Sequence, residues 1–148
     1  MIPFIYAAQE KCVYQAVAAV LVNGTTIFTV RGGPILITAI GAVCVTANNA
    51  TASTLQYSAD GTDGSAVTIT AASASLANAA AGAIVLAVPG TLATAPAVYA
   101  SGVGISGTIN ILVPAGIITN VIATGSTTGT WRQFIRYIPL SPDSTVSG

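Results

Sequence analysis

The stretch FTVRGGPILITAIGAVCVT, residues 28–46, decides the fold of this chain. Its Val, Ile and Thr side chains are stiff at the first side-chain torsion and suit a pleated strand better than a helix. Gly32, Gly33 and Pro34 interrupt it, because glycine accepts positive φ and proline cannot donate a ladder hydrogen bond. The sequence therefore predicts two strands separated by a bend or bulge just before Ile35.

The second of these strands has two faces, and neither carries a charge. Strict alternation places Ile35, Ile37, Ala39, Gly41, Val43 and Val45 on one face, and Leu36, Thr38, Ile40, Ala42, Cys44 and Thr46 on the other. A strand with one solvated face normally alternates between apolar and polar residues. We therefore expect this strand to be covered twice, by the chain's own core and by a neighbouring subunit.

The rarity of charge is the most unusual feature of the composition. Only eight of 148 residues are charged, four basic and four acidic, and residues 64–130 contain none. This fraction is about a fifth of that in ordinary soluble domains. Low net charge and uncovered apolar area both favour association, so the composition predicts an assembling structural protein. The four basic residues are too few and scattered for a phosphate-binding surface, which argues against a nucleic-acid partner.

The side chains that carry out catalysis are scarce. The chain has no His, which excludes the usual Ser-His-Asp and Cys-His sites and His-ligated metals. Of the carboxylates, Glu10 and Asp143 lie near the ends, while Asp60 and Asp63 share a loop typical of Asp-Gly turns and too poor in carboxylates for a calcium site. We expect neither an enzyme nor a cofactor or metal.

Two further patterns concern sulfur chemistry and membranes. Cys12 and Cys44 are interpreted as two buried thiols, since distant cysteines do not establish a disulfide. The Ala-rich residues 71–95 are interrupted by Asn78 and Pro89, so we expect no membrane helix. The first residues lack a basic start followed by a clean apolar run, so no secretion signal is expected.

The chain divides by pattern into three parts. Residues 1–11 are interpreted as an apolar arm, residues 12–140 as a single β domain, and residues 141–148 as a flexible polar tail. The pattern of short strands predicts an all-β fold, an antiparallel β-sandwich or barrel of jelly-roll type, with at most one short helical turn within residues 73–82. Asn23-Gly24 and residues 114–116 predict tight hairpins.

The final strand, residues 130–140, separates into two distinct faces. Trp131, Gln133, Ile135 and Tyr137 lie on one face, predicted to be the core, and Arg132, Phe134, Arg136 and Ile138 lie on the other. The second face suits an interface, although the two arginines could instead solvate a sheet edge. The residues predicted to form interfaces are Ile2, Phe4, Ile5, Leu36, Ile40, Arg132, Phe134 and Arg136.

Five segments carry a resemblance to a known family. They are FTVRGGPILITAI (28–40), CVTANNATASTLQYSAD (44–60), SLANAAAGA (75–83), VPAGII (113–118) and TGTWRQFIRYIPL (128–140). In this order they resemble small virion structural proteins of tailed bacteriophages that decorate or cement the head. The resemblance covers residues 26–142 and implies a β-sandwich or barrel that binds the capsid lattice, often as a trimer, without a cofactor.

The resemblance and the composition together give the functional expectation. We expect a capsid decoration protein that binds the major capsid protein and itself, as a homotrimer, on the outer surface of the virion after assembly in the host bacterial cytoplasm. The first alternative is a tail or spike module that binds a host receptor or glycan. A second alternative, a secreted adhesin or S-layer-like subunit, is weakened by the missing signal sequence.

Overall fold

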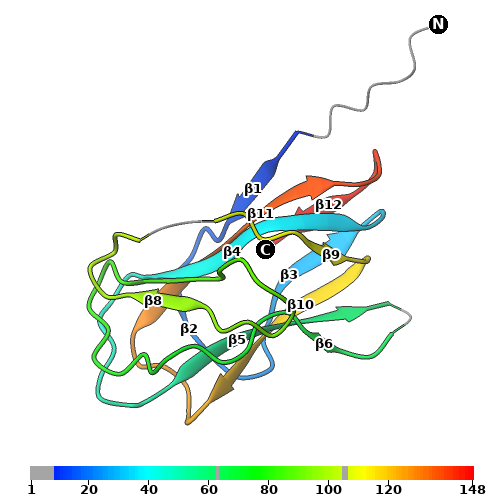
Figure 1. Cartoon of the computed structure of the whole chain (residues 1–148). Coiled ribbons are helices and arrows are strands. Elements are labelled where there is room, and N and C mark those ends of the chain that lie inside the picture. The colour runs from blue at the N-terminus through cyan, green and yellow to red at the C-terminus, as the bar shows by residue number, and fades with distance from the viewer. Residues whose placement is uncertain (1–8, 63, 105–106) are drawn as a thin grey trace, which may run out of the picture.

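The chain folds into two antiparallel sheets packed as a sandwich that does not close into a barrel (Figure 1). The computed structural model describes residues 9–62, 64–104 and 107–148, and none of these forms a helix. The predicted all-β antiparallel sandwich is confirmed.

One sheet has seven strands. Its main path runs β1 (Lys11–Tyr14), β11 (Thr130–Pro139), β4 (Ile35–Cys44), β7 (Ile84–Leu86) and β8 (Ala97–Tyr99). The short strand β2 (Ala19–Val20) lies on the same edge of β11 as β1, and β9 (Ile111–Val113) lies on the same edge of β4 as β7. The two long strands β4 and β11 therefore form the centre of this sheet.

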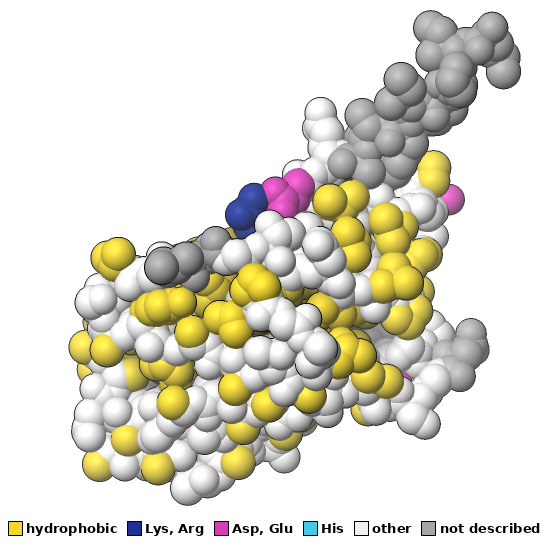
Figure 2. All heavy atoms as spheres, in the orientation of Figure 1, with side chains coloured by type: hydrophobic (Ala, Val, Ile, Leu, Met, Phe, Trp, Pro, Cys, Tyr) yellow, Lys and Arg dark blue, Asp and Glu magenta, His cyan; other side chains and the backbone are white. Residues whose placement is uncertain are grey.

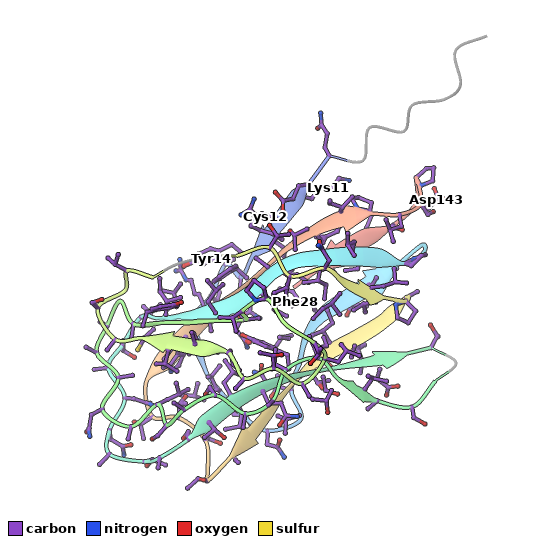
Figure 3. All side chains as sticks on the ribbon, in the orientation of Figure 1. Lys11, Cys12, Tyr14, Phe28 and Asp143 are labelled. Carbon is purple, nitrogen blue, oxygen red and sulfur yellow. The ribbon has the colours of Figure 1, made fainter. Side chains whose placement is uncertain are left out.

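The second sheet has five strands and covers one face of the first. Its order is β12 (Thr145–Ser147), β3 (Thr26–Arg31), β10 (Gly116–Ala123), β5 (Thr54–Gly61) and β6 (Val67–Thr68). Between the sheets lies one core of aliphatic and aromatic side chains. Phe28 of β3 occupies this interior, whereas Lys11, Cys12 and Tyr14 follow one another along β1 at the margin (Figure 3).

Strand β11 has the two faces that its sequence predicts. Trp131, Gln133, Ile135 and Tyr137 are all buried, and Trp131 and Ile135 have no exposed surface. Because the side-chain period of a strand is two, the intervening residues of β11 must point away from the core. This strand fixes which face of the seven-stranded sheet is left for partners.

Strand β4 contains a bulge that changes its faces halfway along. Ile37 pairs with Tyr137 and Ala39 pairs with Arg136, so Thr38 has no partner of its own in the ladder. The extra residue rotates the strand by one position. The core therefore takes Ile35 and Ile37 before the bulge, and Ile40, Ala42 and Cys44 after it. The predicted strict alternation along this strand is wrong beyond Thr38.

The turns predicted as hairpins connect different sheets. Asn23-Gly24 leads from β2 in the seven-stranded sheet to β3 in the other, and residues 114–116 lead from β9 to β10 across the sandwich. The Oδ1 atom of Asn23 accepts a hydrogen bond of 3.0 Å from the backbone N–H of Ile122 in β10. Turn chemistry predicts a reversal of the chain, but it does not decide which strand becomes the partner.

The glycine pair before β4 acts as predicted. Gly32 and Gly33 have φ values of +77° and +152°, and they carry the chain from β3 in one sheet to β4 in the other. A Cβ atom on Gly32 would lie 1.9 Å from the carbonyl oxygen of Asp143. Glycine is therefore required here both by the backbone conformation and by the close approach of the chain's last segment.

Two further segments were considered in the sequence. Residues 73–82 form turns and bends without a helical turn, within the predicted limit of one, and several of their backbone N–H groups bind outside the segment, as from Leu76 to the carbonyl of Ser53 at 2.8 Å. Residues 141–148 are not the expected loose tail. Their strand β12 pairs with β3, and the buried Ser144 donates a hydrogen bond of 2.9 Å to the carbonyl of Pro34.

Candidate interface on the seven-stranded sheet

The outer face of the seven-stranded sheet, the one turned away from the core, is the candidate functional surface. One row of paired residues crosses five strands of it: Tyr14, Phe134, Gly41, Leu86 and Ala97. All five positions face outward, since their chain neighbours Val13, Ile135, Ala42 and Val85 belong to the core or pack against it. The row contains no charged side chain.

Gly41 leaves room for the phenyl ring of Phe134 to lie against the outer face of the sheet. A Cβ atom at Gly41 would lie 2.9 Å from the Cζ atom of Phe134 and 2.3 Å from the carbonyl oxygen of Val85. Because Gly41 has no side chain, the phenyl ring covers the middle of β4. The central strand is thus partly shielded on its outer face by a residue of its own chain, and the expected cover by a neighbouring subunit remains a prediction.

A hollow of about 360 Å³ lies beside this ring. Its walls come from β4, β7, β8, β11 and the loop after β8, and they include Phe134, Leu86, Tyr99 and Val103. Val103 exposes 79% of its surface. Aromatic and aliphatic walls of this kind are typical of the buried centre of a protein–protein interface.

A second apolar row lies at the end of the sheet where β9 replaces β7. Ile138 of β11 pairs with Leu36 of β4, which pairs with Leu112 of β9. Leu112 exposes 64% of its surface. Figure 2 shows one side of the molecule, where yellow apolar and white uncharged atoms dominate and the blue and magenta charged groups are few. Apolar surface on this scale favours a partner.

The arginines of this face are engaged within the chain. Arg136 forms an ion pair with Glu10, and Glu10 also accepts a hydrogen bond from the hydroxyl of Thr38 at the bulge. The hydrogen bond from Thr38 and that from Arg136 hold the pKa of the Glu10 carboxyl below its usual value. The guanidinium of Arg132 lies 5.7 Å from the centre of the Tyr14 ring, within the range of a cation–π contact.

The structure separates the predicted interface residues into three groups. Leu36, Arg132, Phe134 and Arg136 share the outer face of the sheet. Ile40 does not, because the bulge turns it into the core, where it has no exposed surface. Ile2, Phe4 and Ile5 lie outside the described residues. Arg132 and Arg136 do not line a sheet edge, since β11 is flanked by β1 and β2 on one side and β4 on the other.

Several residues of this face were missed by the sequence interpretation. They are Tyr14, Ile84, Leu86, Tyr99, Val103 and Leu112. Their strands are short, and a short apolar run such as residues 84–86 does not show which face is buried. Only the pairing with β4, which the sequence leaves open, places Ile84 and Leu86 outward and Val85 inward.

The remaining candidate chemistry is dispersed. In the described ranges, no three His, Cys, Asp or Glu side chains come together as a possible metal site. Cys44 is buried as predicted, and burial raises the pKa of its thiol, but Cys12 is exposed on β1 and the prediction for it is wrong. No helix long and apolar enough to cross a membrane occurs in the part of the chain that the structure describes.

Comparisons with known proteins add no relative. No protein-family model matches the chain, and no curated protein or solved structure matches it. Any function proposed for this chain therefore depends on its sequence and on the outer face of the seven-stranded sheet.

Proposed function

We propose that this chain is a decoration protein of a tailed-bacteriophage capsid, which binds the outside of the head as a small oligomer and stabilises it. The observation that supports this proposal best is the outer face of the seven-stranded sheet. Rows of apolar side chains cross it from β1 to β8 and from β11 to β9, and its two arginines are engaged within the chain. Such a face is suited to a protein partner and poorly suited to water.

The mechanism in this proposal is binding alone. Each square ångström of apolar surface removed from water contributes about 25 cal/mol, so an interface of ordinary size can hold without charged pairs after the costs of association. The partners are the major capsid protein and further copies of this chain, in a homotrimer, with no role for nucleic acid, membrane or cofactor. Added contact area across capsomer junctions would resist internal pressure from the genome.

The test compares heads with and without this protein. Heads that lack it should release their DNA at a lower temperature, and adding the purified protein back should restore the release temperature. Equal heat resistance of the two kinds of head would contradict the proposal.

The alternative, a tail or spike module that binds a host receptor or glycan, has weaker support. Sugar sites commonly combine an exposed aromatic ring with polar groups that accept and donate hydrogen bonds. The hollow beside Phe134 offers Tyr99 and Arg136, but none of the described residues that line it is Asn or Asp. Binding of the purified protein to host cells, with none to emptied heads, would favour this alternative.

A further inference from the structure

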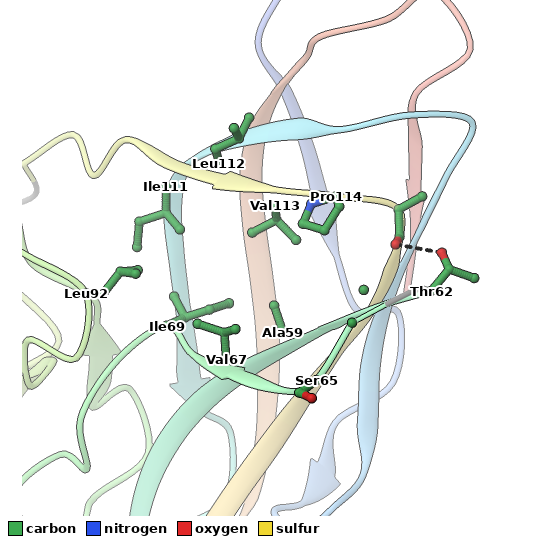
Figure 4. A pocket seen from close by; sticks show the side chains of 13 residues that line it. Ala59, Thr62, Ser65, Val67, Ile69, Leu92, Ile111, Leu112, Val113 and Pro114 are labelled. Carbon is green, nitrogen blue, oxygen red and sulfur yellow. Dashed lines mark hydrogen bonds between the residues drawn. The ribbon is translucent and has the colours of Figure 1, made fainter.

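A second apolar hollow lies at the open side of the sandwich and meets the face described above at Leu112, which borders both. It measures about 650 Å³ and lies between β9 of the seven-stranded sheet and β6 of the other (Figure 4). Ile111 and Val113 approach it from β9, and Val67 and Ile69 approach it from the opposite side. We call this hollow the edge slot.

The edge slot is apolar and open. None of the described residues that line it is charged, and Val67 and Leu92 expose 53% and 55% of their surfaces. One end is closed by Thr62, whose hydroxyl donates a hydrogen bond of 2.9 Å to the carbonyl of Ala115. The volume falls in the range of sites that bury most of a bound ligand.

Both walls of the edge slot are sheet edges. Strand β9 pairs with β4 on one side and β6 pairs with β5 on one side, and no other described strand pairs with them. Edge strands offer unpaired backbone groups to an extended peptide, which can add main-chain hydrogen bonds while its alternate side chains fill a pocket. The slot therefore fits an uncharged, extended, apolar segment.

The chain itself carries a segment of this kind. Residues 1–8, MIPFIYAA, lie outside the described residues, contain no charged side chain and include Ile2, Phe4, Ile5 and Tyr6. Fully extended, eight residues span about 26 Å. Pro3 is compatible with an edge strand, which does not need every N–H.

The position of β1 favours the slot of another copy over the chain's own slot. Strands β1 and β9 are three strand intervals apart across β11 and β4, about 14 Å. Strand β1 is antiparallel to β11, and its first residue, Lys11, pairs with Tyr137 near the end of β11. Followed towards the N-terminus, the chain therefore leaves β1 in the direction in which β11 ends. Its own slot lies in the row that runs from Lys11 through Tyr137 and Ile37 to Ile111, so reaching it would require the segment to turn aside from this direction and cross β11 and β4.

We propose that residues 1–8 of one copy dock in the edge slot of a neighbouring copy and add to the free edge of β9 or β6. This inference depends on the self-association in the proposed function and gives it a specific contact. An arm that enters the next copy makes a head-to-tail interface, which closes when the copies form a ring. A ring of three would match the expected homotrimer.

The test uses full-length variants and sedimentation velocity. The arm variant carries Ile2→Asp and Phe4→Asp, and the slot variant carries Val67→Glu and Leu92→Asp. The control carries Val17→Glu and Val22→Asp, the same two new charges, on side chains that are 75% and 42% exposed and do not line the slot. Circular dichroism checks that each variant is folded, and the slot substitutions alter only side chains more than half exposed.

We expect the wild type and the control to associate, and the arm and slot variants each to associate at least about 30-fold more weakly, the size of a hot-spot loss. An equal mixture of the two variants should form heterodimers, because the intact arm of the slot variant can enter the intact slot of the arm variant. A monomeric wild type at about 100 μM, an unaffected slot variant, or a mixture that stays monomeric would each overturn the inference.

Binding to emptied heads separates this inference from the proposed function. If the variants lose self-association but the wild type binds no head, the slot contact stands and the capsid proposal fails. If the wild type binds heads and the slot variant still associates normally, the capsid proposal stands and the slot contact fails.

Discussion

Replacement of Ile40 by Ala tests the bulge that determines which residues of β4 face outward. Strict alternation from Ile37 would place Ile40 on the outer face, whereas the unpaired Thr38 rotates it into the core with no exposed surface. The matched substitution is Leu36→Ala, on the same strand, since Leu36 lies on the outer face and is only partly buried.

The expected magnitude follows from burial. Ile40→Ala removes three buried carbons, worth about 0.8 kcal/mol each, or about 2.4 kcal/mol. The remaining cavity adds to this loss, and the whole change should fall within about 2–5 kcal/mol. Leu36→Ala should cost less than about 1.5 kcal/mol, because its side chain already contacts solvent.

Urea unfolding at neutral pH measures the loss of unfolding free energy in each variant from the shift of its midpoint. We expect the Ile40 variant to be the less stable of the two by more than about 1 kcal/mol. If both variants lost the same small amount, Ile40 would not be in the core, and the assignment of the outer face would be wrong.

Four further predictions concern single side chains. Gly41→Ala should destabilise the fold by about 1–3 kcal/mol in urea unfolding, because the added carbon meets a carbonyl oxygen and an aromatic ring; a neutral result would mean that the ring does not lie there. Ser144→Ala should cost about 0.5–1.5 kcal/mol in the same assay by removing one of the two hydrogen bonds that the carbonyl of Pro34 accepts, the other coming from Leu140, and no loss would indicate that the last strand is not docked. A maleimide reagent should label Cys12 in the folded protein and Cys44 only after unfolding, and rapid labelling of both would contradict the core. The pKa of Glu10 is lowered in the fold, so the stability that its carboxylate contributes is complete above about pH 4.5 and is lost as the pH falls below that value. Glu10→Gln should weaken the dependence of the urea midpoint on pH in this acid range, and an unchanged dependence would refute the ion pair.

Most of the fold class could be predicted from the side chains of two strands. The β-branched residues of 35–44 and the clean alternation of 131–137 indicate strands, and the structure contains both. The glycine pair before Ile35 correctly predicted a bend, because its signal is local and depends on backbone conformation alone.

Features that depend on partners distant in sequence were the ones missed. The bulge at Thr38 arises from the register with β11, almost a hundred residues later, and strict alternation cannot show it. The Asn23-Gly24 turn bonds to β10, and the final strand β12 finds its partner in β3. Short-range patterns specify where a chain turns, but the pairing of strands is decided by the whole core.

The candidate interface was predicted in part for the same reason. Residues of the long strand β11 could be assigned to the outer face from their spacing, and Arg132, Phe134 and Arg136 lie there. The contributions of β1, β7 and β9 depend on strand order, which the sequence leaves open. Such a surface assembles only when short strands from distant parts of the chain line up beside β4.

The central claim is that the outer face of the seven-stranded sheet is covered by a partner in the working state. Oxidative footprinting tests it directly by comparing Tyr14 and Val103 in the isolated chain and in the chain bound to heads, with the fully buried Tyr57 as an internal reference. We expect Tyr14 and Val103 to be labelled in the isolated protein and strongly protected on the head. Equal labelling of these two residues in both states would contradict this expectation.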